Sequence, residues 1–352
     1  MSRARKVFNH IFIEGLSAMA IGLFATLIVG TIVQQVGLFV GGSVGDMIFL
    51  IGRVASMLTG IGIGVSVAYK FQGSPLVVVS AGVVGMVGAF ATRLLDGTMI
   101  VDGAMVVPGP GEPLGAFIAA YIGILFGRLI AGKTKVDILV TPIVTIGTGA
   151  LAGLLVGPPI SGMMRGLGEV INWGAEQQPI VMGVVIAVVM GMALTLPISS
   201  AALGIILNLS GPAAGAATIG CCVNMIGFAV ASYRENKVGG LVSQGIGTSM
   251  LQMPNIMKKP IIWLPAIITS AILGPLGITV FQMTNNATGS GMGTAGLVGP
   301  IMTWQTMSAA EPPMVVLGKI LLMHIILPAI VTLVIAEFMR KKGWIKPGDM
   351  KL

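Results

Sequence analysis

The stretch TNNATGSGMGTAGLVGP, residues 284–300, separates two long apolar segments at 260–281 and 313–338. Its five glycines, three threonines, one serine and two adjacent asparagines leave too little apolar surface to face lipid. It has no Lys, Arg, Asp or Glu, so it is not built as a loop in bulk water either. Irregular backbone at membrane depth occurs only where protein buries it or where it lines a watery cavity. We therefore expect a re-entrant or broken-helix segment that lines a solute site.

The composition identifies the class of protein around this stretch. Of 352 residues, 55% are hydrophobic and only 9% are charged, and the mean hydropathy is +0.98. No soluble fold of this size buries so much apolar surface, so the chain is predicted to be an all-α polytopic membrane protein in the lipid bilayer of the cytoplasmic membrane. The net charge of +8 comes largely from clusters at 1–6, 133–135 and 340–342. Such clusters mark cytoplasmic loops and indicate no nucleic-acid partner, so both termini are expected in the cytoplasm.

About 20 apolar residues cross a bilayer, and this length divides the chain into spans. The predicted spans are 16–35, 47–68, 75–91, 114–130, 136–156, 180–196, 213–232, 261–281 and 315–338. Between them, 159–178 carries apolar residues at helical spacing beside Arg165 and Glu169, which predicts an interfacial amphipathic helix. We expect about eight to ten crossings in total.

Two further segments are too polar and too broken to be plain spans. One is 197–212, where Pro197, Ser199 and Ser200 interrupt an apolar background, and the other is 241–260. Basic loops on the cytoplasmic side require an even number of crossings between 233–237 and 340–342, which two full spans satisfy if 241–260 and 284–300 both enter and return. By the same count, 197–212 is either a third crossing or a half-span that turns back. We therefore expect two or three re-entrant or broken segments that together form one site.

Uncharged amides and hydroxyls are the main candidates for solute contact, because amides offer both donors and acceptors to a neutral polar solute. The alternative is that these groups cap broken helices. Ionisable residues inside spans are functional candidates as well, since placing them in a membrane is costly. The candidates from these two arguments are Gln252, Asn255, Asn285, Asn286, Thr288, Glu311 and His324.

The sequence holds no catalytic constellation. His10 and His324 have no Cys or acidic partner at ligand spacing, so no metal and no other cofactor is expected. The adjacent Cys221 and Cys222 lie in an apolar run and point to different faces of a helix, which favours a packing role for both thiols.

The segment KVDILVTPIVTIGTGALAGLLVGPPISGMMRGLGEVINW, residues 135–173, resembles the membrane subunit IIC of the bacterial phosphotransferase system, in its fructose-type branch. The likeness continues in MGVVIAVVMGMALTLPISSAALGIIL and GIGTSMLQMPNI, and extends to about residue 300. A divergent subgroup that includes clostridial toxin-regulator membrane proteins is similar overall. The resemblance implies sugar contact at Pro197, Ser199 and Ser200 and at Gln252 and Asn255, although the acidic residue usual in the second element is missing.

The resemblance also implies partners and an organisation. Residues 1–135 would be scaffold helices with a possible dimer interface, and 136–352 the transport region of a homodimer. The favoured function is a transporter subunit that moves a small polar solute, preferentially a sugar. Any phosphorylation would need a separate IIB subunit and its IIA donor. The alternatives are a membrane sensor or regulator without net transport, and a secondary transporter of a non-sugar solute.

Overall fold

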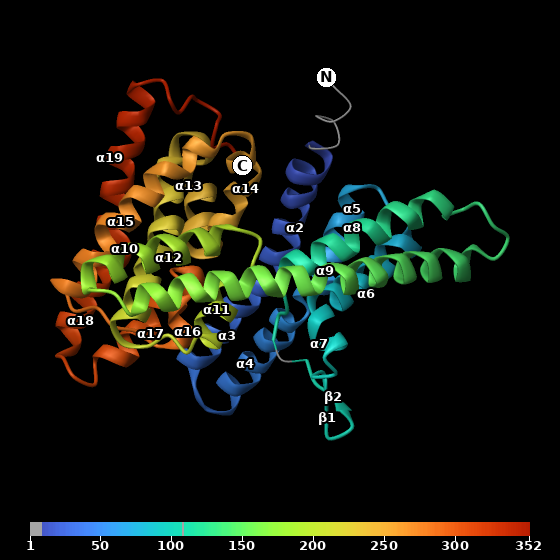
Figure 1. The fold of residues 1–352 in the computed structure, drawn as a ribbon, viewed down its shortest axis with the longest axis horizontal. Coiled ribbons are helices and arrows are strands. Elements are labelled where there is room, and N and C mark those ends of the chain that lie inside the picture. The colour runs from blue at the N-terminus through green and yellow to red at the C-terminus, as the bar shows by residue number, and fades with distance from the viewer. Residues whose placement is uncertain (1–8, 108) are drawn as a thin grey trace. The chain divides into compact units, whose positions relative to one another are not determined.

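The computed structural model describes residues 9–107 and 109–352, which form helices joined by short connections (Figure 1). The two described strands, β1 (Ile100–Val101) and β2 (Ala104–Met105), make a small antiparallel hairpin. The chain divides into two compact units, Met1–Met164 and Arg165–Leu352. The functional division expected at residue 136 stays a prediction.

The first unit packs its helices through small residues. Its elements are η1 (Asn9–Gly15), α2 (Leu16–Leu23), η2 (Phe24–Ile28), α3 (Val29–Val40), α4 (Gly42–Met57), α5 (Thr59–Lys70), α6 (Pro75–Ala89), α7 (Ala91–Leu95) and α8 (Pro113–Ile130). A Cβ on Gly60 would lie 2.7 Å from the carbonyl oxygen of Gly85, so α5 and α6 approach with their backbones in contact. Membrane helices use small residues for this kind of contact because lipid supplies no hydrophobic drive for association.

The all-α polytopic class is confirmed. Among the described residues six helices are long and apolar enough to cross a membrane, and α4 with α5 forms a further bent pair. Two shorter apolar helices are α6 and α10 (Pro179–Thr195). The total number of crossings stays a prediction.

The span expected at 47–68 corresponds to α4 and α5, which form a pair bent by 52°. The Thr59 hydroxyl donates to the Ser56 carbonyl at 2.6 Å, which competes with the helical backbone bonds at this point.

The interfacial helix expected at 159–178 is continuous with the span before it, as α9 (Asp137–Ala175). Pro158 and Pro159 lie inside this helix. Each proline removes one N–H that would bond the Leu154 or Leu155 carbonyl, and its ring crowds that carbonyl, although the fixed φ of proline is compatible with a helix. A helix of this length measures about 58 Å, so it is longer than the roughly 30 Å hydrocarbon core.

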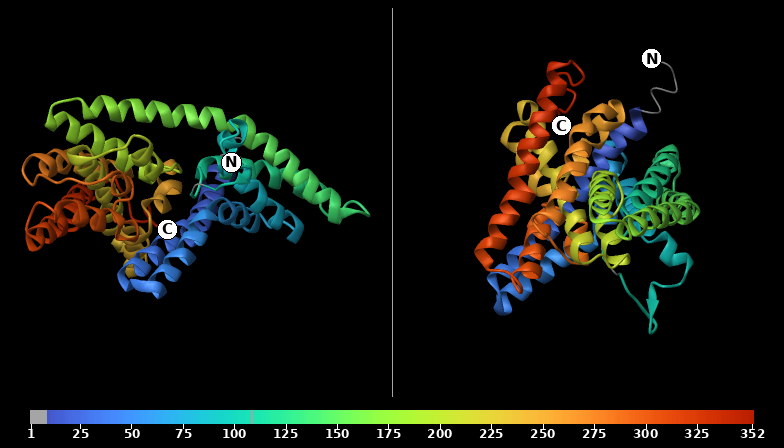
Figure 2. Two further views of the ribbon diagram at one scale, coloured as in Figure 1. Left: turned by 90° about the horizontal axis from the view of Figure 1, so that it is seen from below. Right: turned by 60° about the vertical axis from the view of Figure 1, so that its left-hand side comes forward.

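The second unit is arranged around α12 (Gly211–Ala231), which contacts α10, α15 and α19 (Figure 2). Sixteen of its 21 residues are buried, so α12 is surrounded by protein and not by lipid. The other elements are α11 (Ser200–Ile206), α13 (Tyr233–Val242), η3 (Ser243–Gly247), η4 (Ser249–Gln252), α14 (Met253–Lys258), η5 (Pro260–Trp263), α15 (Leu264–Thr279), α16 (Ala287–Ser290), η6 (Ala295–Leu297), α17 (Val298–Met307), α18 (Pro313–Ile320), η7 (Leu321–Ile326) and α19 (Leu327–Lys341).

Gly220 sets the contact between α10 and α12. A Cβ at this position would overlap the Ala187 carbonyl of α10, because the two backbones touch here. We expect Gly220→Ala to lower the free energy of unfolding by about 1–3 kcal/mol through overpacking. Chemical unfolding in detergent micelles measures this. Gly318→Ala in α18 is the matched control, since nothing lies within 4 Å of its added Cβ. Equal losses in the two variants would contradict the packing role of Gly220.

Candidate functional site

Three broken segments lie in the second unit, as the sequence predicts. The first is 196–210, which holds the short helix α11, the second is 243–258, and the third is 284–297, which holds α16 and η6. Each contacts α12 or an element packed on α12. We name the region where they meet the three-segment site.

The first and third segments contact each other directly. The Ser200 hydroxyl donates to the Gly291 carbonyl at 2.7 Å, and both residues are buried. A Cβ on Gly291 would overlap the Ser200 carbonyl, and a Cβ on Gly293 would lie 2.7 Å from the Cys221 backbone in α12. Gly293 also has φ +52, a conformation that side-chain-bearing residues rarely adopt. The glycines of TNNATGSGMGTAGLVGP therefore serve close backbone approach.

Asn285 fastens the third segment to α12. Its Nδ2 donates to the Thr218 hydroxyl at 2.7 Å and to the Gly299 carbonyl at 3.2 Å. Its backbone N–H donates to the carbonyl of Gly211, the first residue of α12, at 3.2 Å. Because Asn285 is 1% exposed and both amide hydrogens are used, its side chain organises the site from within.

The second segment is joined to the third segment and to α10 through buried hydroxyl groups. The Thr294 hydroxyl donates to the Gly245 carbonyl at 2.5 Å. Ser249 Oγ lies 2.7 Å from Thr195 Oγ1 at the end of α10. Thr195 Oγ1 lies 3.2 Å from Asn224 Oδ1 in α12, which also accepts from Trp263 Nε1 at 2.9 Å. The site is therefore one connected polar network around α12.

Among the predicted residues of the third segment, Asn286 and Thr288 have polar groups that no close hydrogen bond uses. Asn286 is half-buried and its Oδ1 accepts from the Gly289 N–H at 3.0 Å, which caps α16. Its Nδ2 makes only long contacts, 3.4 Å to Thr306 Oγ1 and 3.7 Å to Met302 Sδ. Thr288 is exposed. Pro197 and Ser199 are buried at the break before α11.

Gln252 and Asn255 lie together but contact the end of the chain. Gln252 Nε2 donates to Gln244 Oε1 at 2.8 Å and to the Met350 carbonyl at 2.9 Å. Asn255 Nδ2 donates to Gln252 Oε1 and to the Lys351 carbonyl, both at 2.9 Å. All amide hydrogens of these two side chains are thus used within the protein.

Glu311 and His324 are not part of the network that joins the three segments. Glu311 accepts from Lys319 Nζ at 2.6 and 2.8 Å in the connection into α18. His324 lies in the π-helical turn η7 and is fully buried. Neither of its ring nitrogens has a hydrogen-bond partner among the described residues.

Four members of the site were not predicted from the sequence: Thr195, Thr218, Asn224 and Ser249. Asn224 carries a signal that could have found it, since it is the only amide side chain within the apolar helix α12. A buried amide in an otherwise apolar helix requires partners. The hydroxyl residues carry no such signal, because threonine and serine also bond to their own helix backbone.

Substitutions of Asn285 and Thr288 distinguish a buried residue that organises the site from an exposed residue of the same segment. We expect Asn285→Ala to lower the free energy of unfolding by about 1–3 kcal/mol, because it leaves the buried Gly299 carbonyl and Asn286 N–H without their partners. Thr288→Ala is the control in the same segment. Because Thr288 is exposed, this substitution should change the free energy of unfolding by less than about 0.5 kcal/mol. Urea or thermal unfolding of both variants checks this, and equal stability would contradict the role of Asn285.

No curated protein matches the sequence. The family model described as "Phosphotransferase system, EIIC" matches residues 13–352, which extends well beyond 136–300 and includes all three broken segments. The match does not distinguish the fructose-type branch, which stays a prediction. Together with the apolar helices, it shows that this multi-pass membrane chain belongs to the EIIC family of phosphotransferase-system transporter subunits.

Proposed function

We propose that the three-segment site binds a small polar solute, preferentially a sugar, and exposes it alternately to the two sides of the membrane. The observation that carries this proposal is the combination of irregular backbone and polar side chains gathered in one place within an apolar protein. Backbone of this kind is tolerated where it lines a cavity. Binding sites at broken helices near the bilayer midplane are a recurring design in transporters.

The half-buried Asn286 and the exposed Thr288 are the groups that we assign to solute contact. An amide and a hydroxyl both donate and accept hydrogen bonds, which fits the alternating needs of sugar hydroxyls. Asn285 and Ser200 would support them by holding α16 in place, through the bonds to Thr218 and Gly291. Pro197 and Ser199 come from the break opposite, where the family resemblance expects sugar contact.

Movement of the site is supported by its backbone. Leu297 has φ +60 and Gly296 φ +52 at the start of α17. A leucine in the left-handed region costs about 1–2 kcal/mol. Strain of this size persists where the surrounding structure imposes it, and a second conformation would relieve it.

The partners follow from the family to which the chain belongs. Phosphorylation of a sugar hydroxyl needs a phosphoryl donor, and the thiols that could carry a phosphoryl group, Cys221 and Cys222, are fully buried in α12. A separate IIB subunit, recharged by IIA, would phosphorylate the solute at the cytoplasmic face. We further propose that both termini lie in the cytoplasm and that the protein is a homodimer.

Uptake into proteoliposomes that contain only this protein tests the proposal. We expect saturable uptake of at least one compound from a panel of labelled hexoses, hexitols and other polar solutes. Asn286→Ala should raise the half-saturating concentration about tenfold, as loss of a hydrogen bond in a solute site costs about 1–1.5 kcal/mol. Gln305→Ala, an exposed amide in α17, is the control and should leave uptake unchanged.

The possible outcomes separate transport from sensing. If no solute moves but one raises the unfolding temperature, the protein binds without transport and acts as a sensor. If no solute moves and none changes the unfolding temperature, both readings are wrong. If uptake is saturable but insensitive to Asn286→Ala, the protein transports and the assigned contact is wrong.

A further inference from the structure

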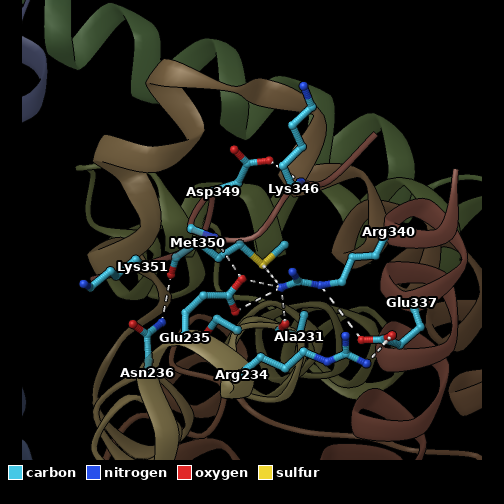
Figure 3. A network of polar contacts seen from close by, with 12 residues as sticks. Ala231, Arg234, Glu235, Asn236, Glu337, Arg340, Lys346, Asp349, Met350 and Lys351 are labelled. Atoms are coloured by element: carbon cyan, nitrogen blue, oxygen red, sulfur yellow. Dashed lines mark hydrogen bonds and ion pairs between the residues drawn. The ribbon is translucent and has the colours of Figure 1, made fainter. Parts of the chain in front are cut away.

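Residues 343–352 follow the last helix and fold back over α13 and α14 (Figure 3). Two of their side chains are buried, Ile345 at 1% and Met350 at 0% exposure. These residues contain no helix or strand, and a segment of this kind is ordered only where specific contacts tie it down. Its burial therefore calls for an account of what holds it.

Three amide side chains bind the backbone of this tail. The Met350 carbonyl accepts from Asn236 Nδ2 at 2.8 Å and from Gln252 Nε2 at 2.9 Å. Asn255 Nδ2 donates to the Lys351 carbonyl, and Asn236 Oδ1 accepts from the Leu352 N–H, both at 2.9 Å. Because the amides contact backbone groups, the tail is bound in one register, in the manner of a peptide in a binding site.

Two ion pairs reinforce these bonds. Lys259 Nζ donates to Asp349 Oδ2 at 2.5 Å, and both side chains are largely buried. Arg340 in α19 pairs with Glu235 in α13 at 2.9 Å, and each of these side chains is only 8% exposed. Glu235 Oε1 also accepts from the Gly348 N–H at 3.4 Å, so the tail contributes a hydrogen bond to this buried ion pair.

The tail ties down a stretch of irregular backbone. Its contacts lie on both sides of residues 237–251, at Asn236 and at Gln252. Between them Lys237 has φ 53 and ψ −152, η3 is a π-helical turn, Thr248 is extended and η4 is a 3₁₀ helix. A positive φ at lysine is strained, and short π and 3₁₀ turns mark places where helices deform.

We propose that residues 343–352 are an intramolecular latch: when docked they hold the backbone between Asn236 and Gln252 in place, and when undocked they free the second broken segment to move. Movement there would reach the rest of the network through Gly245, which is bonded to Thr294, and Ser249, which is bonded to Thr195. The docking rests on these contacts alone, whereas its effect on solute movement rests on the proposed function.

Protonation of Asp349 does not open the latch near neutral pH. Burial raises the pKa of this carboxyl, whereas hydrogen bonds from Lys259 and from the Lys346 N–H lower it. Together the hydrogen bonds outweigh burial, so the pKa lies below its ordinary value. A depressed carboxyl pKa favours the docked form above the pKa of a free Asp, about 3.9, and this contribution is lost as the pH falls through the lowered value. Asp349 therefore stays ionised near neutral pH, so a change of pH in that range does not release its bond to Lys259.

Hydrogen exchange of the full-length protein in lipid nanodiscs, without any solute, tests the latch. Lys259→Asp and Asp349→Lys each turn the ion pair into a repulsion. We expect either variant to raise exchange about fivefold, both in 345–352 and in 237–252. The swapped double variant, Lys259→Asp with Asp349→Lys, restores the pair and should return both segments to within about twofold of the parent. Lys351→Asp is the matched control, because the Lys351 side chain is exposed.

Each outcome decides the proposal. Faster exchange in the tail with none in 237–252 would show that the tail is a passive cover, and failure of the double variant to restore protection would show that the pair does not hold it. Either result overturns the latch. In proteoliposomes the single variants should change the uptake rate at least about twofold, and the double variant should reverse this. An intact latch in a protein that neither moves nor binds any solute would contradict the proposed function alone.

Discussion

Every backbone N–H and C=O of a broken helix must find a partner in the protein or in a water-filled cavity, because the hydrocarbon core offers no water. The second unit meets this requirement with side chains of α12 and with close backbone contacts. Thr218 and Asn224 project from a helix that is otherwise apolar, and each is fully buried. Through them the third segment and the end of α10 are bonded to α12. The irregular segments depend on this one helix for their structure.

A consequence is that the segments are mechanically joined. Ser200 connects the first segment to the third, Thr294 connects the third to the second, and Ser249 connects the second to Thr195. A shift in one segment must break or carry along bonds in the others. The tail at Gln252 attaches to the same network at its far end. Opening and closing of the site would then move the segments together between a small number of conformations, which suits a two-state transporter.

The features that could be predicted from the sequence are those that depend on the local composition of the chain. Residues 284–300 are too polar for lipid and too uncharged for bulk water, and this predicted the broken helix and its neighbours at 197–212 and 241–260. Ser200 and Asn285 were predicted within the site and lie in its network. The excess of glycine predicted close packing, which Gly220 and Gly291 display.

Tertiary partners were beyond such reasoning. Gln252 and Asn255 are polar residues in a broken segment. Their spacing does not indicate whether their amides bind a solute or the Met350 and Lys351 carbonyls of the chain itself. The bend between α4 and α5 occurs where the Thr59 hydroxyl bonds the Ser56 carbonyl, a bond that threonine also makes in straight helices. The helix α9 continues through Pro158 and Pro159, a pair that ordinarily predicts a break. Each of these features needs three-dimensional contacts that no local pattern encodes.

The central claim is that the broken segments line a watery site that a solute occupies. Reaction of a membrane-impermeant maleimide with Thr288→Cys in proteoliposomes tests it most directly, since Cys221 and Cys222 are fully buried and the parent protein supplies the background. The account predicts that the new thiol reacts from the aqueous side and that a saturating transported solute slows the reaction at least about tenfold. A thiol that does not react, or reacts equally fast with and without solute, would contradict it.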